Sequence, residues 1–204
     1  YELWAIAGKG IQDSKKNSDK TMMELKPEQI WLDWAFKDIP CDKEKLKEAS
    51  EEIAHMWEIT FYDRKLREHA GEMLAGLKSL GLYVGVISNT GSLFQPVATM
   101  EEYGVRQYMD SITLSSIVGY RKPHPNIFKI ALALGDFKPE ECAYVGDTLS
   151  RDVVGPRKLG FGKCFKISSF LTPLKDVGKF DVVPDHEITD IYEVYTILKE
   201  ELGK

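Results

Sequence analysis

The sequence predicts an α/β fold in which a parallel sheet lies between layers of helices. From about residue 66 onward, short apolar runs alternate with amphipathic segments of helical length. Several of those helical segments stop at a glycine, the residue that most often follows a helix end. Such alternation indicates right-handed βαβ crossovers, which place successive strands parallel in one sheet. Residues 1–65 hold no convincing strand, so we expect an all-helical domain there and an α/β domain over residues 66–204.

The first domain is expected to consist of amphipathic helices. Apolar residues recur at helical spacing over residues 27–36 and 43–57, with charged residues between them. Pro27 and Asp42 stand where helix starts are favoured. The polar stretch 12–19 is predicted to be a loop, because it lacks apolar residues and is rich in Ser, Asp and Asn.

The second domain is expected to alternate strands and helices. The predicted strands are residues 82–88, 111–115, 142–145, 163–167 and 180–183. The predicted helices are residues 66–80, 93–103, 126–134, 151–159 and 188–202. Continuous apolar runs such as 82–88 are typical of strands that are buried on both faces of a sheet.

Composition narrows the class of protein. With 204 residues and 43% hydrophobic content, the chain can bury one core plus a small accessory domain. The formal net charge of −5 argues against a nucleic-acid-binding protein, which would carry a basic patch. No apolar run reaches the length of a membrane span, and no signal-peptide pattern is present. We therefore expect a cytoplasmic protein that binds neither nucleic acid nor membrane, as a monomer or homodimer.

Two strand ends carry groups suited to an anion. The predicted strand 82–88 ends in Ser88 and Asn89, whose small donors suit phosphate oxygens, although an ordinary turn with an N-cap residue would look the same. Lys122 precedes Pro123, which holds the backbone extended and could aim the ammonium group at an anion. The alternative for Lys122 is a solvated loop residue.

A third strand end carries two carboxylates. The apolar run that begins at Cys142 ends in Gly146 and Asp147, and Asp152 follows five residues later. In open α/β sheets, ligands bind at the carboxyl ends of the strands. Two nearby carboxylates at that edge suggest Mg²⁺, which prefers oxygen ligands and often helps to hold substrate phosphates. The alternatives are an ordinary Gly-Asp turn and a solvated helical Asp152.

Together these residues resemble the motifs of the haloacid dehalogenase-like hydrolase superfamily. Three of that family's motifs are matched in order by Ser88 with Asn89, by Lys122, and by Asp147 with Asp152. The resemblance implies a Rossmann-like α/β core over residues 66–204 and a helical cap over residues 1–65. Such motifs are specific for the superfamily but do not name a substrate.

The family's first motif has no counterpart in the chain. That motif is an apolar strand ending in Asp-x-Asp, whose first aspartate is the nucleophile. The candidate aspartates lie in predicted loops or amphipathic helices: Asp13, Asp19, Asp33, Asp38 and Asp42. By resemblance, the missing strand would lie between the strand ending at Ser88 and the one ending at Asp147. We therefore expect a first strand upstream of Tyr1, and the position of the nucleophile is unknown; an intact mass of 23.2 kDa for the folded, active protein would contradict this expectation.

The resemblance implies a Mg²⁺-dependent phosphatase that hydrolyses a small phosphorylated metabolite through an aspartyl-phosphate intermediate. Ser88 and Lys122 would be catalytic, and together with Asn89 they would hold the phosphoryl oxygens. Mg²⁺ would be held by Asp147 with support from Asp152. The helical cap would close over the site and select the substrate.

Other reactions within the resemblance stay open. A phosphomutase or a phosphonate-cleaving enzyme would keep the metal motif, and a noncatalytic descendant that binds a phosphorylated ligand would explain the missing nucleophile. Dehalogenation is disfavoured, because a metal-binding aspartate at position 147 has no purpose in displacing halide.

Overall fold

The computed structural model describes residues 2–62, 64–169, 172–178 and 180–204. By the density of their contacts, these residues form two compact units. The first unit combines Tyr1–Arg64 with Ser88–Thr99 and Leu114–Arg121. The second combines Lys65–Ile87, Met100–Thr113 and Lys122–Lys204. Each unit has its own hydrophobic core.

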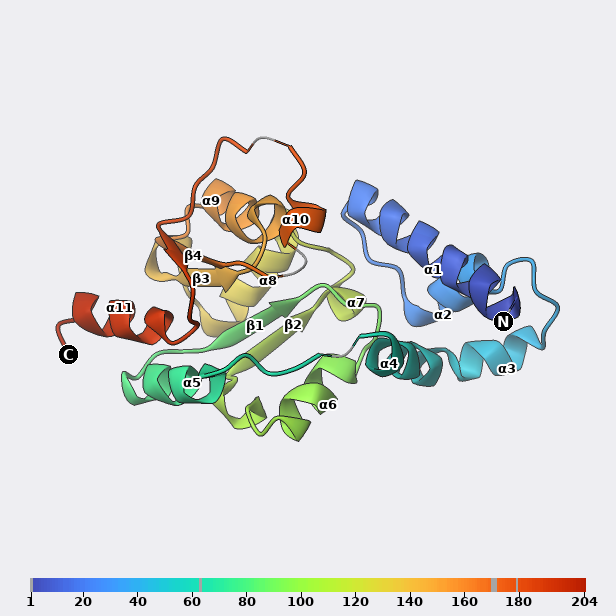
Figure 1. The fold of residues 1–204 in the computed structure, drawn as a ribbon, viewed down its shortest axis with the longest axis horizontal. Helices are drawn as coiled ribbons and strands as arrows, with labels where there is room; N and C mark the ends of the chain where they lie inside the picture. Colours follow the sequence, from blue (N-terminus) through green and yellow to red (C-terminus); the bar gives the residue numbers. More distant parts are fainter. Residues whose placement is uncertain (1, 63, 170–171, 179) are drawn as a thin grey trace. The chain divides into compact units, whose positions relative to one another are not determined.

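The first unit is helical apart from the last residues of two strands. Its main helices are α1 (Glu2–Thr21), α2 (Pro27–Gln29), the π-helix η1 (Ile30–Ala35), α3 (Lys43–Glu48), α4 (Ser50–Phe61) and α7 (Ser115–Val118), and it includes the start of α6 (Gln95–Glu102). Helix α1 packs against η1 (Figure 1). The helices predicted over 27–36 and 43–57 are confirmed, with the second divided at Ala49 into α3 and α4.

The predicted loop over residues 12–19 is wrong, because this stretch continues α1. Ala7, Ile11, Ser14 and Ser18 are all buried, and their spacing of three and four residues places them on one face of the helix. The Ser14 hydroxyl donates to the Ile11 carbonyl at 2.8 Å, which satisfies its polar group inside the helix. The buried face of α1 therefore continues through Ser14 and Ser18, and a search for apolar residues at helical spacing does not detect it.

The second unit alternates helices and strands. Its first half contains α5 (Ala70–Ser79), β1 (Gly85–Ser88), η2 (Arg106–Tyr108) and β2 (Ser111–Leu114), the last residues of β1 and β2 being counted with the first unit. Its second half contains α8 (Pro125–Gly135), η3 (Pro139–Glu141), β3 (Ala143–Gly146), η4 (Leu149–Val153), α9 (Val154–Leu159), β4 (Lys163–Ile167), α10 (Thr172–Lys175), β5 (His186–Ile188) and α11 (Glu193–Glu201). Helix α11 packs against α5 (Figure 1).

The expected α/β fold with parallel strands flanked by helices is confirmed. Strand β4 is parallel to both β3 and β5, with Val145 opposite Phe165 and Phe165 opposite His186. In the part of the chain that the structure describes, the strands form two sheets, β1–β2 and β3–β4–β5, where the sequence suggested one. No strand among these residues joins β1 to β3, so the two sets are not connected by a ladder of hydrogen bonds.

Two boundaries near the end of the second unit differ from prediction. The strand expected over 180–183 is wrong, and the strand that pairs with β4 is β5 instead. Pro184 follows this stretch and cannot donate to a strand ladder, and Val183 is 73% exposed. Pairing begins only at Asp185, whose backbone N–H donates to the Cys164 carbonyl at 2.8 Å. The last helix accordingly begins at Glu193 rather than at 188.

No helix in the described ranges is both long enough and apolar enough to span a membrane.

Candidate active site

A buried ion pair lies at the centre of the candidate site. The Lys122 Nζ donates to Asp152 Oδ1 at 2.8 Å and to the Tyr144 hydroxyl at 3.1 Å. The second carboxylate oxygen of Asp152 accepts from the hydroxyl of Thr148 at 2.8 Å and from its backbone N–H at 3.2 Å. The side chains of Lys122 and Asp152 are 14% and 2% exposed. Both Asp152 oxygens are thus engaged, and the pair is held in one geometry.

The pair is charged despite its burial. Burial acts to lower the pKa of Lys122, but the Asp152 charge and the Tyr144 hydroxyl outweigh it, so this pKa lies above its ordinary value. Burial acts to raise the pKa of Asp152, but the Lys122 charge and the Thr148 hydroxyl bring it below the ordinary value. Burial also raises the pKa of Tyr144 to about 12, so its hydroxyl stays neutral.

A glycine at the end of β3 makes this arrangement possible. A Cβ atom on Gly146 would lie 2.2 Å from the Cβ of Asp152, far inside van der Waals contact. Gly155 of α9 likewise permits close packing, because a Cβ there would lie 2.5 Å from the ring of Phe128 in α8. These two glycines let η4 and α9 approach β3 and α8 closely, and this approach brings Asp152 to Lys122.

Asp147 is the more accessible carboxylate of the two. It follows β3 directly, and its side chain is 27% exposed. Its Oδ2 accepts from the Ser169 hydroxyl at 2.6 Å, and its Oδ1 lies 3.8 Å from the guanidinium of Arg151. The backbone carbonyl of Asp147 accepts from the Thr172 hydroxyl at 2.7 Å. Asp147 can therefore still coordinate a ligand from solvent, whereas both oxygens of Asp152 are already hydrogen-bonded to protein groups.

An open cavity of about 270 Å³ exposes these groups at the carboxyl ends of β3 and β4. It is lined by Arg67, Lys122, Val145, Gly146, Asp147, Asp152, Ile167 and Ile191. This is the edge of a parallel sheet at which ligands bind. Since Lys122 and Asp152 neutralise each other, the cavity offers one further cation, Arg67, and one further carboxylate, Asp147. Such a lining can accept both an anion and a metal ion.

The carboxylates of this cavity suit a magnesium ion only if a bound ligand supplies further oxygen atoms to the metal. Across the described ranges, no group of three or more His, Cys, Asp or Glu side chains is gathered closely enough to hold a metal ion. Mg²⁺, however, keeps several waters and is commonly bound through one or two carboxylates together with substrate phosphates. The partly exposed carboxylate of Asp147 fits that pattern, whereas both oxygens of Asp152 are hydrogen-bonded to Lys122 and Thr148.

The structure brings together some of the predicted residues. Lys122, Asp147 and Asp152 line one cavity in the second unit. Ser88 ends β1 and Asn89 follows it, both half-buried and both counted with the first unit. Their roles in binding phosphate stay predictions.

Sequence reasoning missed several members of the site. Tyr144 was hidden in an apolar run, although a tyrosine inside a buried strand usually needs a hydrogen-bond partner. Thr148, directly after Asp147, could have been suspected as a turn residue. Arg67 and Ser169 carry no local signal, because folding alone brings Arg67 into the cavity lining and the Ser169 hydroxyl to Asp147.

The parallel strands flanked by helices, with a charged cavity at the carboxyl ends of β3 and β4, define an α/β protein of the class that places ligand sites at this edge of the sheet. A family model described as haloacid dehalogenase-like hydrolase matches residues 5–160. The chain therefore belongs to the haloacid dehalogenase-like hydrolase family.

Individual relatives agree with that assignment. The chain is 29% identical over 153 residues to the glyceraldehyde 3-phosphate phosphatase of Pyrococcus furiosus, covering 71% of this chain and 61% of the relative. It is 32% identical over 123 residues to haloacid dehalogenase-like hydrolase domain-containing protein 3 of Bos taurus, covering 58% of this chain and 46% of the relative. The chain thus spans about half to three fifths of the curated relatives it matches.

Among solved structures, the 2-haloacid dehalogenase of Pseudomonas syringae is similar with a TM-score of 0.66 and 19% identity. The match covers 98% of this chain and 80% of the dehalogenase. At this level of identity, the likeness is one of fold.

Proposed function

We propose that the protein is a Mg²⁺-dependent phosphatase that hydrolyses a small phosphorylated metabolite. The observation that carries the proposal is the cavity in which the partly exposed carboxylate of Asp147 lies beside the buried Lys122–Asp152 pair. A partly exposed carboxylate that can bind a hard cation, next to a fixed ammonium group, suits a phosphate ester that needs both. Family membership and the names of several relatives support the same reaction class.

Each residue of the site has a role that follows from its contacts. Asp147 would hold Mg²⁺, which lowers the charge repulsion between an incoming phosphate and the carboxylates when bound. Lys122 would hold a phosphoryl oxygen, and Asp152 would position Lys122 by fixing its ammonium group. Ser88 and Asn89 are proposed as further donors to the phosphoryl oxygens. Stabilisation of charge by such fixed groups is the main catalytic effect in phosphoryl transfer.

The covalent step would use a carboxylate nucleophile. An aspartate attacks phosphorus, the alcohol leaves, and water then hydrolyses the aspartyl phosphate. The residue that performs this attack is not identified.

A triose phosphate is the first substrate to test, because several relatives are named glyceraldehyde 3-phosphate phosphatase. We further propose that residues 1–65 act as a cap that selects the substrate, and that the enzyme works in the cytoplasm as a monomer or homodimer.

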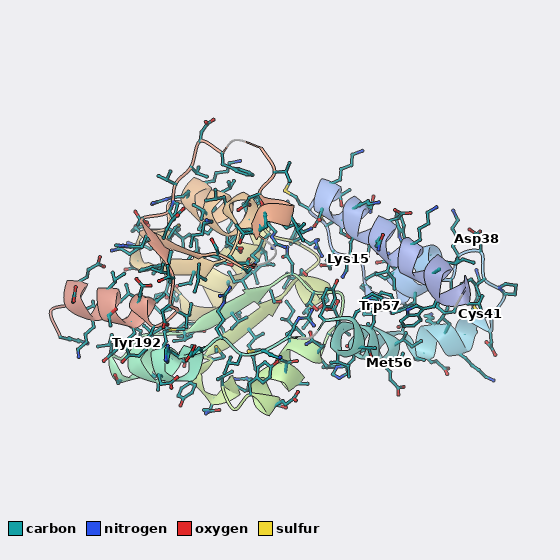
Figure 2. All side chains as sticks on the ribbon, viewed as in Figure 1. Lys15, Asp38, Cys41, Met56, Trp57 and Tyr192 are labelled. Carbon is teal, nitrogen blue, oxygen red and sulfur yellow. The ribbon has the colours of Figure 1, made fainter. Side chains whose placement is uncertain are left out.

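The decisive experiment compares Asp147→Asn with wild type in the full-length protein. Substrates are glyceraldehyde 3-phosphate and an aryl phosphate, each with and without Mg²⁺. Loss of the metal ligand should lower kcat/KM about 100-fold or more, because a bound metal supplies several kcal/mol of charge stabilisation. Asp38→Asn is the matched control, since Asp38 is an exposed loop residue of the first unit (Figure 2). Equal slow hydrolysis by both variants, insensitive to Mg²⁺, would defeat the proposal.

A noncatalytic protein that binds a phosphorylated ligand is the second candidate. The absence of any Asp-x-Asp from the sequence favours it. Tight phosphate binding without turnover, in the full-length protein with Mg²⁺, would support this candidate over the phosphatase.

A further inference from the structure

One cation of the cavity in the second unit, Arg67, has no role in the site described so far. It lines the cavity together with Lys122, Asp147 and Asp152, and all four residues belong to the second unit. Among the residues that the structure describes, the Arg67 guanidinium makes one hydrogen bond, from Nη2 to the Ser168 carbonyl at 3.4 Å, and no ion pair. That bond is long, and a guanidinium carries five N–H donors, so most of its capacity is left for a ligand.

The two carboxylates of the cavity are matched by other cations. Asp152 pairs with Lys122 at 2.8 Å. Asp147 lies 3.8 Å from the guanidinium of Arg151, four residues further along the chain. Within the described lining, the positive charge of Arg67 is therefore left unbalanced. An unbalanced cation at the wall of a cavity raises the local concentration of anions.

A third carboxylate, which precedes a lining residue in the chain, is held by a histidine. Asp190 directly precedes Ile191, which lines the cavity. The Asp190 Oδ2 lies 2.7 Å from His69 Nδ1, and its Oδ1 accepts from the Tyr192 backbone N–H at 2.8 Å. Both oxygens of Asp190 are thus engaged, and this carboxylate does not neutralise Arg67.

Arg67 is held at the carboxyl end of β4. Its backbone carbonyl accepts from the Ala70 N–H at 3.2 Å, in the turn that starts α5. Its side chain donates to the carbonyl of Ser168, the residue that follows β4. The next residue, Ser169, donates its hydroxyl to Asp147 at 2.6 Å. Arg67 and Asp147 are therefore joined through two consecutive serines at one edge of the sheet.

The spacing of the strands suits one anion between two cations. Lys122 donates to the hydroxyl of Tyr144 in β3, whereas Arg67 donates to the residue that follows β4. Strands β3 and β4 are parallel neighbours, and neighbouring strands lie about 4.8 Å apart. Two charge-assisted hydrogen bonds of about 2.8 Å each span a similar distance. A single phosphoryl group can therefore accept from both cations.

The chemistry of arginine also suits this ligand. A planar guanidinium presents pairs of N–H groups that match two oxygens of a phosphate. Ile167 and Ile191 line the same cavity, and apolar walls strengthen a hydrogen bond between charged groups because they exclude water.

We propose that Arg67 is a further phosphate-binding residue of this site, whose guanidinium donates to the phosphoryl oxygens from the β4 side while Lys122 donates from the β3 side. The proposal rests on the phosphatase function proposed above and adds to it a residue that no sequence motif identifies. Inorganic phosphate, the product of that reaction, binds at the same place as the phosphoryl group of the substrate.

The test measures the binding of inorganic phosphate to the full-length protein with Mg²⁺ by isothermal titration calorimetry. Arg67→Gln should weaken binding about 10-fold or more, because hydrogen bonds between charged groups are lost. Arg67→Lys keeps the charge but not the paired N–H groups, so its affinity should be intermediate. Arg106→Gln is the matched control and should bind phosphate as wild type does. Arg106 belongs to the same unit, likewise donates to a backbone carbonyl, that of Met109, and lies outside the cavity lining.

Urea unfolding of the same variants separates binding from folding. Because Arg67 is exposed and makes one long hydrogen bond, Arg67→Gln should keep the wild-type midpoint. If wild type binds phosphate and Arg67→Gln binds it equally well, the inference is wrong and the phosphatase proposal is untouched. If Arg67→Gln loses binding and stability together and Arg67→Lys restores neither, the residue serves the fold and the inference is also wrong. If wild type binds no phosphate, the phosphatase proposal and this inference fail together.

Discussion

The Lys122–Asp152 ion pair should prove essential to the stability of the second unit. Its Nζ–Oδ1 distance of 2.8 Å corresponds to an attraction of about 6 kcal/mol at an effective dielectric constant of about 20. Lys122→Met would leave the Asp152 carboxylate 2% exposed with Thr148 as its remaining partner. Breaking a buried pair in this way lowers the free energy of unfolding by about 3–5 kcal/mol. The double variant Lys122→Met with Asp152→Asn carries no buried charge, so it should be less damaged than the sum of the single variants by about 1–3 kcal/mol.

The pH dependence gives an independent check. Because the folded pKa of Asp152 lies below its ordinary value, the stabilisation from the pair is complete above about pH 4 and lost as pH falls through the folded pKa. In Lys122→Met, burial dominates and raises the pKa of Asp152. The deficit of this variant should therefore shrink from about pH 7 to about pH 5, as the carboxyl becomes neutral. Urea unfolding at both pH values measures this, and single-variant losses that add within about 0.5 kcal/mol would refute the reasoning.

Three further predictions concern neighbouring features. Gly146→Ala places a Cβ 2.2 Å from the nearest side-chain carbon and should lower the free energy of unfolding by about 1–3 kcal/mol. Gly71→Ala is the control: its Cβ would meet open space, so the free energy of unfolding should stay the same or rise by up to about 1 kcal/mol. Equal urea midpoints for the two variants would contradict this. The Asp190 hydrogen bond raises the pKa of His69, so the pairing stabilises fully below about pH 6.5 and is lost as pH rises through the raised value. In an NMR titration, Asp190→Asn should lower the pKa of His69, and an unchanged curve would rule out the pairing. Tyr144→Phe should cost about 1 kcal/mol in urea unfolding by removing a buried hydrogen bond, and wild-type stability would show that the hydroxyl contributes nothing.

The local pattern of apolar residues was enough to predict those helices and strands whose buried side chains are themselves apolar. The strand over 163–167 was predicted with its observed bounds, because a short apolar run has few other places in an α/β fold. The stretch 12–19 was misread because its buried face consists of serines, which an apolar period does not detect. The stretch 180–183 was misread in the opposite sense: its valines suggested a strand, but Pro184 cannot donate to a strand ladder and Val183 is exposed. Both errors concern which side chains of a segment are buried, and this burial depends on contacts with segments that are distant in the sequence.

The same limit applies to the candidate site. The rule that ligands bind at the carboxyl ends of parallel strands was enough to select Lys122, Asp147 and Asp152, which line one cavity. It could not distinguish the two carboxylates, because both follow the same strand. Their difference comes from side chains that meet only after folding: Asp152 spends both oxygens on Lys122 and Thr148, whereas Asp147 stays partly exposed. A motif thus predicts which residues gather, but the difference in burial and hydrogen bonding between Asp147 and Asp152, on which their proposed roles depend, follows only from the folded structure.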